Sequence, residues 1–260
     1  MQALAGLLLV AALLVSSVPH MIAQCFLIEQ VQLTGELDRI DPTLFRRTVS
    51  ESTQGNYFSI DLKAVQEAAL SVPWVKSVRV HRRWPDTIEI DVRQHKPLAL
   101  WEDGRLVNEQ GQLFVANPDE VDNPLDLPEF FGPEQRIDEI IGRYHRFTKM
   151  LQVARLDARI VELSVSVIGS WDVVIAGENI PPTAITLGVE KQDWTLEDRF
   201  GVVIVNYPDV VKSMQGPPSA IDARYKLAFA AALPAQTLQR YKSELSRRKA
   251  AEAVVNRHRQ

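Results

Sequence analysis

Hydrophobic and polar residues alternate along two neighbouring stretches of the chain, 75–82 and 88–93, which are separated by Trp84-Pro85-Asp86. A period of two places successive side chains on opposite faces of a sheet. Val75 departs from the pattern, because it falls among the polar positions. The two stretches predict a β-hairpin with one apolar face, made by Val78, Val80, Ile88, Ile90 and Val92.

Two segments before this hairpin have the spacing of amphipathic helices. One covers 42–52, where proline takes the first helical position and Asp41 precedes it as a cap. The other follows Asp61, whose carboxylate can accept hydrogen bonds from the N–H groups of a first turn. Its apolar stripe consists of Val65, Ala68, Ala69 and Val72. With an alternating strand at 26–33, the order strand, helix, helix, strand, strand predicts a three-stranded sheet covered by two helices.

The second half of the chain predicts a larger sheet accompanied by two helices. Apolar residues in 137–156 recur at three- and four-residue spacing, which is typical of an amphipathic helix. In 195–212 the local signals conflict, because Thr195-x-x-Asp can start a helix whereas 201–205 is a β-branched run. We expect a helix there. Strands are predicted at 96–101, 106–108, 113–115, 160–168, 171–175, 183–187 and 220–233.

The first 28 residues contain no Asp, Glu, Lys or Arg. A helix that crosses a bilayer needs about 20 mostly apolar residues, which 3–26 supplies. The alternative is a cleaved signal peptide, for which Ser16, Ser17 and Pro19 leave a site open. A basic leader and a clean A-x-A site are both missing, so the sequence favours a membrane anchor, at residues 1–25, and not a signal peptide.

Composition narrows the function further. The 260 residues have room for one large or two modest domains, and a net charge of −4 gives no argument for binding nucleic acid. Cys25 is the single cysteine, so an intrachain disulfide is excluded. The tail 235–260 carries seven Lys or Arg against two Glu, a net charge of +5. We interpret it as a solvated charged extension, with binding to an anionic lipid or polymer as the alternative.

Several phrases of the sequence are similar to those of the FtsQ/DivIB family of bacterial cell-division proteins. In the first half they are 56–61 (NYFSID), Pro73-Trp74-Val75 and Arg83-Trp84-Pro85-Asp86-Thr87, and both tryptophans are predicted to pack. In the second half they are 99–101, 106–108, 111–114, 127–133, 185–188 and Asp222-x-Arg224-Tyr225. The resemblance implies an α+β protein with a single N-terminal transmembrane helix. It places a POTRA domain (β-α-α-β-β) at 26–95 and a mixed β-domain with helices on one face at 96–234.

The resemblance also implies a function. Members of this family are bitopic scaffolds of the division complex at the septum, held in the inner membrane with most of the chain in the periplasm. They link early and late division proteins and bind FtsB and FtsL. The family's terminal strand lies near a sheet edge, where a partner can add a strand. This assigns partner binding to Arg224, Tyr225, Phe229 and Leu233.

Catalytic chemistry has no support in the sequence. It contains no G-x-S-x-G, H-E-x-x-H, Walker A or G-x-G-x-x-G motif, and its five histidines lack metal-ligand spacing. We therefore expect no enzyme activity, cofactor or metal. Two alternatives are a POTRA-bearing component of outer-membrane translocation and an exported envelope enzyme. The first needs a series of barrel strands of about 10 residues each, for which the chain is too short. The second needs a convergent acid or nucleophile site.

Overall fold

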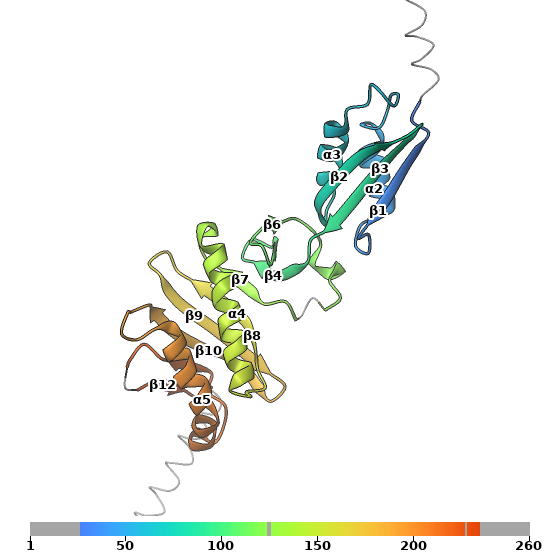
Figure 1. The fold of residues 1–260 in the computed structure, drawn as a ribbon. Coiled ribbons are helices and arrows are strands. Elements are labelled where there is room, and N and C mark those ends of the chain that lie inside the picture. Colours follow the sequence, from blue (N-terminus) through green and yellow to red (C-terminus); the bar gives the residue numbers. More distant parts are fainter. Residues whose placement is uncertain (1–26, 124–125, 227, 235–260) are drawn as a thin grey trace, which may run out of the picture. The chain divides into compact units, whose positions relative to one another are not determined.

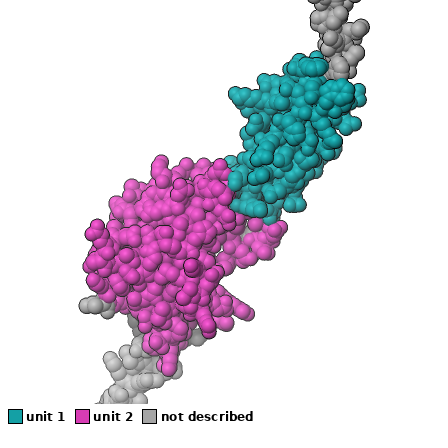
Figure 2. All heavy atoms as spheres, in the orientation of Figure 1, with its two compact units in different colours: residues 1–96, 114–120 teal, residues 97–113, 121–260 magenta. Residues whose placement is uncertain are grey.

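The computed structural model describes residues 27–123, 126–226 and 228–234. The predicted anchor and the basic tail lie outside this part of the chain. Within it, no helix is long and apolar enough to cross a membrane. The chain forms two compact units (Figure 2). Unit 1 comprises the described residues up to Lys96 together with Phe114–Glu120, and unit 2 comprises Pro97–Leu113 and the described residues from Val121 onward.

Unit 1 has the predicted order of strand, helix, helix, strand, strand. Its elements are β1 (Gln30–Gly35), α2 (Pro42–Ser50), α3 (Leu62–Leu70), β2 (Val75–Arg83) and β3 (Thr87–Gln94) (Figure 1). The sheet order is β1-β3-β2, with β1 parallel and β2 antiparallel to β3. The central position of β3 explains why its apolar residues are the most deeply buried of the hairpin.

Local signals account for the two helices of unit 1. The Asp41 carboxylate accepts a hydrogen bond from Thr43 N at 2.8 Å, and the Asp61 carboxylate accepts one from Lys63 N at 2.9 Å. Both caps were expected, since each satisfies N–H groups that have no partner inside the helix. Val75 is buried although its parity is polar, because the pairing of β2 with β3 shifts register between Val75 and Ser77.

Segment 114–120 completes the core of unit 1. The Phe114 ring stacks on His95 at a centroid distance of 4.1 Å and meets Trp74 edge-on at 5.5 Å. The Trp74 indole N–H donates to the Glu120 carboxylate. Trp74 is therefore packed as predicted, whereas Trp84 is not: it stands on the β2–β3 turn with 69% of its surface exposed. The prediction that both tryptophans pack is wrong for Trp84, because a turn residue at the end of a small sheet has no layer above it.

Unit 2 is built on a nine-stranded sheet with the order β12-β11-β10-β9-β8-β7-β4-β5-β6. Its strands are β4 (Pro97–Trp101), β5 (Leu106–Asn108), β6 (Leu113–Phe114), β7 (Glu129–Phe131), β8 (Arg159–Val165), β9 (Ser170–Gly177), β10 (Ile180–Val189), β11 (Ala220–Asp222) and β12 (Ala230–Ala232). Helices α4 (Ile137–Val153) and α5 (Leu196–Met214) lie on one face of this sheet (Figure 1). Short 3-10 turns occur at Pro118–Glu120, in unit 1, and at Glu134–Arg136.

The segment with conflicting signals is a helix, as expected. Thr195 and Asp198 form a reciprocal capping box at the start of α5. Two residues of the β-branched run, Val203 and Ile204, fall on a helical stripe that packs on the sheet together with Phe200, Tyr207 and Val210, whereas Val202 and Val205 are exposed. Burial of this stripe outweighs the local preference for a strand, which is a fraction of a kilocalorie per mole for each residue.

The single terminal strand predicted at 220–233 is wrong. The structure has two short strands, β11 and β12, that run antiparallel to each other and are joined by a loop. The Asp222 side chain accepts a hydrogen bond from Arg224 N at 3.1 Å, which turns the chain directly after β11. Arg224 and Tyr225 consequently belong to the loop and not to a strand.

Candidate protein-binding edge of unit 2

Strand β12 is one edge of the nine-stranded sheet. Ala184 N donates to Ser219 O and Ala223 N donates to Thr186 O, so these two groups face β10, whereas Ser219 N donates to Ala232 O in β12. Because peptide groups alternate along a strand, Ile221 faces β10 as well. The even-numbered residues face β12, where Ala220 pairs with Ala232 and Asp222 pairs with Ala230. The peptide groups of Ala231 then point away from the sheet, because they alternate along a strand. This leaves an N–H donor and a C=O acceptor on the side of β12 where no other strand of the described residues pairs.

The loop between β11 and β12, residues 223–229, lies beside this edge. Arg224 Nε donates to Asp222 Oδ1 at 2.9 Å, and its terminal nitrogen lies 2.6 Å from Oδ2. These bonds lower the pKa of the Asp222 carboxyl and raise that of the Arg224 guanidinium, so both groups are charged at neutral pH. The planar guanidinium of Arg224 suits a carboxylate, and it already holds that of Asp222. It remains 54% exposed, however, which leaves room for a second acceptor.

A glycine in β10 positions the Arg224 side chain. Gly188 has φ +75°, and a Cβ atom at that position would lie 2.9 Å from Arg224 Cγ and 3.1 Å from Cδ. The aliphatic part of Arg224 therefore packs directly on the Gly188 backbone. A larger residue at 188 would have to displace it, in addition to adopting an unfavourable backbone conformation.

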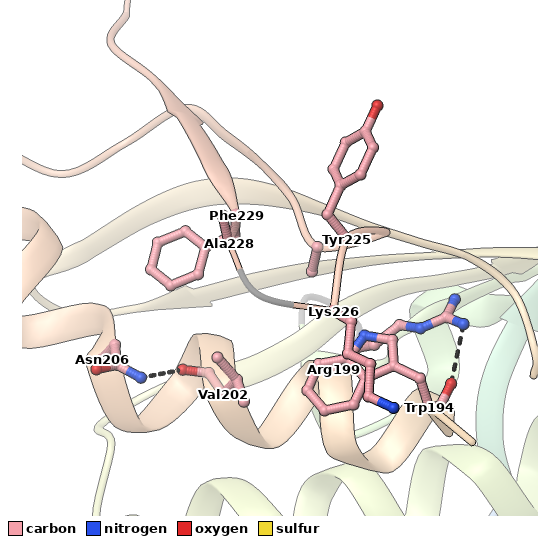
Figure 3. Close-up of a pocket in the computed structure, with 9 residues that line it drawn as sticks. Trp194, Arg199, Val202, Asn206, Tyr225, Lys226, Ala228 and Phe229 are labelled. Atoms are coloured by element: carbon pink, nitrogen blue, oxygen red, sulfur yellow. Dashed lines mark hydrogen bonds between the residues drawn. The ribbon is translucent and has the colours of Figure 1, made fainter.

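The other three predicted residues differ in exposure. Tyr225 is 63% exposed, and Figure 3 shows its ring pointing away from α5. Phe229 and Leu233 are half-buried, and Phe229 packs against the hydrophobic core of unit 2. Of the four predicted residues, the structure thus brings Tyr225 and Phe229 to the lining of one pocket. Tyr225 is available as an exposed anchor, whereas Phe229 forms part of the pocket wall.

This pocket has a volume of about 410 Å³ and lies between α5 and the loop 223–229 (Figure 3). Arg199 is 1% exposed and donates to Val189 O and Trp194 O, both at 2.9 Å, and to Leu187 O. Burial lowers its pKa. Two further donors at the pocket, Arg199 Nε and Trp194 Nε1, are buried without a partner among the described residues. Burying a donor without a partner costs about 1–3 kcal/mol.

A lysine closes the outer end of the pocket. Lys226 Nζ lies 3.3 Å from Asp193 Oδ2, and this contact lowers the pKa of the Asp193 carboxyl. Sequence reasoning missed Trp194, Arg199 and Lys226. Only Arg199 gave a signal, since it stands on the stripe of α5 that packs on the sheet, where an unpaired cation is costly. Trp194 comes near Tyr225 only through the fold, which also brings Lys226, the sequence neighbour of Tyr225, to Asp193.

The arrangement defines a class of protein. Among residues 27–123, 126–226 and 228–234, no group of His, Cys, Asp and Glu could hold a metal ion. An open strand edge and an exposed aromatic ring beside a pocket are features by which proteins bind peptides. Together with a β-α-α-β-β unit 1, they describe a POTRA-bearing interaction protein.

Comparisons with known proteins identify the family. Residues 26–95 match the family model of the POTRA domain, FtsQ-type, and residues 99–224 match that of the cell division protein FtsQ/DivIB, C-terminal. The chain belongs to the FtsQ/DivIB family of cell division proteins. The second match ends at Arg224, so Tyr225 and the residues of β12 lie beyond it.

Curated relatives agree with this assignment. The chain is 31% identical to the cell division protein FtsQ of Burkholderia pseudomallei over 205 residues, which covers 79% of each chain. It is 33% identical to that of Nitrosospira multiformis over 198 residues, 76% of this chain and 78% of the relative. It is 28% identical to that of Coxiella burnetii over 201 residues, 77% and 78% of the two chains.

Proposed function

We propose that this chain is a bitopic scaffold of the cell-division complex. Its uncharged N-terminal segment crosses the inner membrane once, and units 1 and 2 lie in the periplasm at the septum. Unit 2 binds FtsB, and through it FtsL, whereas unit 1 offers a separate docking surface to other division proteins. In this way the chain links early and late division proteins. It performs no covalent chemistry, since its contribution is to gather partners in the plane of the membrane.

The open edge at β12 carries this proposal. A segment of FtsB adds a strand there, and its backbone pairs with the N–H and C=O groups of Ala231. Three alanines leave this edge without bulky side chains, so a partner strand can approach it closely. Backbone pairing of this kind gives affinity but little selectivity, which must come from the side chains around the edge.

Selectivity comes from the loop 223–229. Tyr225 supplies a large anchor with a low entropic cost of ordering. Arg224, held by Asp222 and Gly188, presents its remaining donors to a partner carboxylate. Arg199 and Trp194 bind an acceptor that enters the pocket, and Phe229 and Leu233 supply apolar contact. Truncating a well-packed aromatic or Arg anchor to alanine costs about 2 kcal/mol or more of binding free energy, which is a loss of roughly thirtyfold in affinity.

The test is a titration of the periplasmic segment of FtsB against the purified full-length protein in detergent, followed by anisotropy. Ala231→Pro removes the outward N–H and should abolish strand addition. Ala231→Ser is its matched control, because it keeps the N–H and the small size. Tyr225→Ala should weaken binding by roughly thirtyfold. If Ala231→Pro binds FtsB as tightly as Ala231→Ser does, the edge is not the docking site.

A separate experiment tests the membrane topology. A reporter that is active only in the periplasm, fused after Leu233, should be active in cells. Activity of the opposite, cytoplasmic reporter would reject the topology. Recovery of a soluble protein that begins near residue 26 would instead support the signal-peptide alternative.

A further inference from the structure

One end of unit 1 carries an exposed apolar patch. Leu27, Phe58 and Trp84 are 53%, 62% and 69% exposed, and they are the three most exposed large apolar side chains among residues 27–96. They are named the Trp84 patch here. None of them contributes to the edge of unit 2. Large apolar side chains exposed at one end of a domain point to a surface that another molecule covers.

Hydrogen bonds bring the segments that carry the three residues together from distant parts of the sequence. Leu27 forms a β-bridge with Asn56, whose side chain accepts from Phe58 N at 2.9 Å. Two residues on from Leu27, Glu29 N donates to Asp86 O in the turn that carries Trp84, at 3.0 Å. Figure 1 shows the start of β1 and the β2–β3 turn at the same end of the sheet. These contacts hold the segments that carry Leu27, Phe58 and Trp84 at one end of unit 1.

The composition of the patch matches a bilayer interface. Tryptophan and tyrosine collect at the level of the lipid headgroups, because their rings are apolar and carry a polar atom. Tyr57 belongs to the same loop and meets the Phe58 ring edge-on at 5.3 Å. Charged residues at this end balance in sign: Arg82 and Arg83 are opposed by Glu29 and Asp86. Apolar contact, not attraction to anionic lipid, would therefore dominate.

The sequence places the bilayer next to the patch. The stretch without any charged residue runs from residue 1 to Ile28 and includes Leu27 itself. Extended chain advances at most about 3.6 Å per residue, so Leu27 lies within roughly 4 Å of the residue that precedes it. A segment that crosses the membrane before Leu27 must therefore deliver this end of unit 1 to the membrane surface.

We propose that the Trp84 patch rests in the headgroup region of the bilayer and fixes the orientation of unit 1 on the membrane. The proposal rests on the membrane anchor of the proposed function. It assigns the Arg-Trp-Pro-Asp turn a role as a membrane contact in addition to its role as a hairpin turn.

Fluorescence quenching by brominated lipids tests the contact. The full-length protein is reconstituted in vesicles whose lipids carry bromine near the headgroup, and tryptophan emission is compared with that in unbrominated vesicles. Trp74, Trp101 and Trp171 are at most 2% exposed, so quenching should come from Trp84. Trp84→Phe should remove most of the quenching. Trp194→Phe is the matched control, since Trp194 is half-buried in unit 2 and its loss should leave the quenching in place.

The outcomes separate this inference from the proposed function. Extraction of the chain by alkaline carbonate would overturn the anchor, and the patch contact with it. If the chain resists carbonate but Trp84→Phe is quenched like wild type, the patch contact alone is wrong. Quenching should also persist at high salt, because the patch has no net charge. Quenching of Trp84 by aqueous iodide in the vesicles would likewise overturn the membrane contact. If this iodide quenching then disappears when a division partner is added, the patch binds protein instead.

Discussion

Replacing Gly188 by alanine tests how the backbone of β10 positions the binding loop. Gly188 has φ +75°, a conformation that costs an L-residue roughly 1–2 kcal/mol. The added Cβ would also lie 2.9 Å from Arg224 Cγ, so the arginine side chain must leave its rotamer, which costs about 0.5–1.5 kcal/mol. We expect Gly188→Ala to destabilise unit 2 by about 2 kcal/mol and to weaken FtsB binding, since Arg224 is displaced.

The chain provides a matched control in Gly104. Its φ is +88°, and a Cβ there would meet no atom within 4 Å, so Gly104→Ala carries the backbone cost alone. Urea unfolding of the purified protein measures both variants. In an Arg224→Ala background the extra cost of Gly188→Ala should disappear, because the clashing side chain is gone. If Gly188→Ala and Gly104→Ala lower the free energy of unfolding equally, the contact between Gly188 and Arg224 does not contribute to stability. The same conclusion follows if the extra loss of Gly188→Ala persists in the Arg224→Ala variant.

Two further predictions concern unit 1. Val78→Asp places a charge on the buried face of the hairpin and should lower the free energy of unfolding in urea by several kcal/mol. Ser77→Asp, on the open face, is the control and should leave this free energy nearly unchanged. Equal unfolding midpoints for the two variants would mean that the register is wrong. Burial, followed by the charge of Lys76, lowers the pKa of His95 from 6.5 to about 4. Below pH 6.5 the unfolded chain binds a proton that the folded chain does not, so the stability of unit 1 should fall between about pH 6.5 and 4, and His95→Gln should lose this part of the pH dependence while keeping the rest.

The sequence predicted those elements of this protein that depend on neighbouring residues. Asp41 and Asp61 cap their helices through groups two or three positions away, and the alternation in 75–82 and 88–93 is enough to specify a hairpin with one apolar face. Local backbone geometry decides each of these features, and it can be deduced from a short window of sequence.

Only the tertiary structure decided how distant segments pair. Strand β1 pairs in parallel with β3, and β10 pairs in parallel with β11, so both pairings join residues far apart in the chain. Within 220–233, β11 pairs with β10 on one side and with β12 on the other, which makes two strands of this segment. The same is true of Phe114, which reaches back to His95 and Trp74, and of Trp84, which the end of the sheet leaves uncovered. The binding pocket depends on such pairings as well, because Arg199 and Trp194 meet Tyr225 only after α5 has packed on the sheet. No local pattern specifies these contacts, since the residues whose burial selects them are far apart in the sequence.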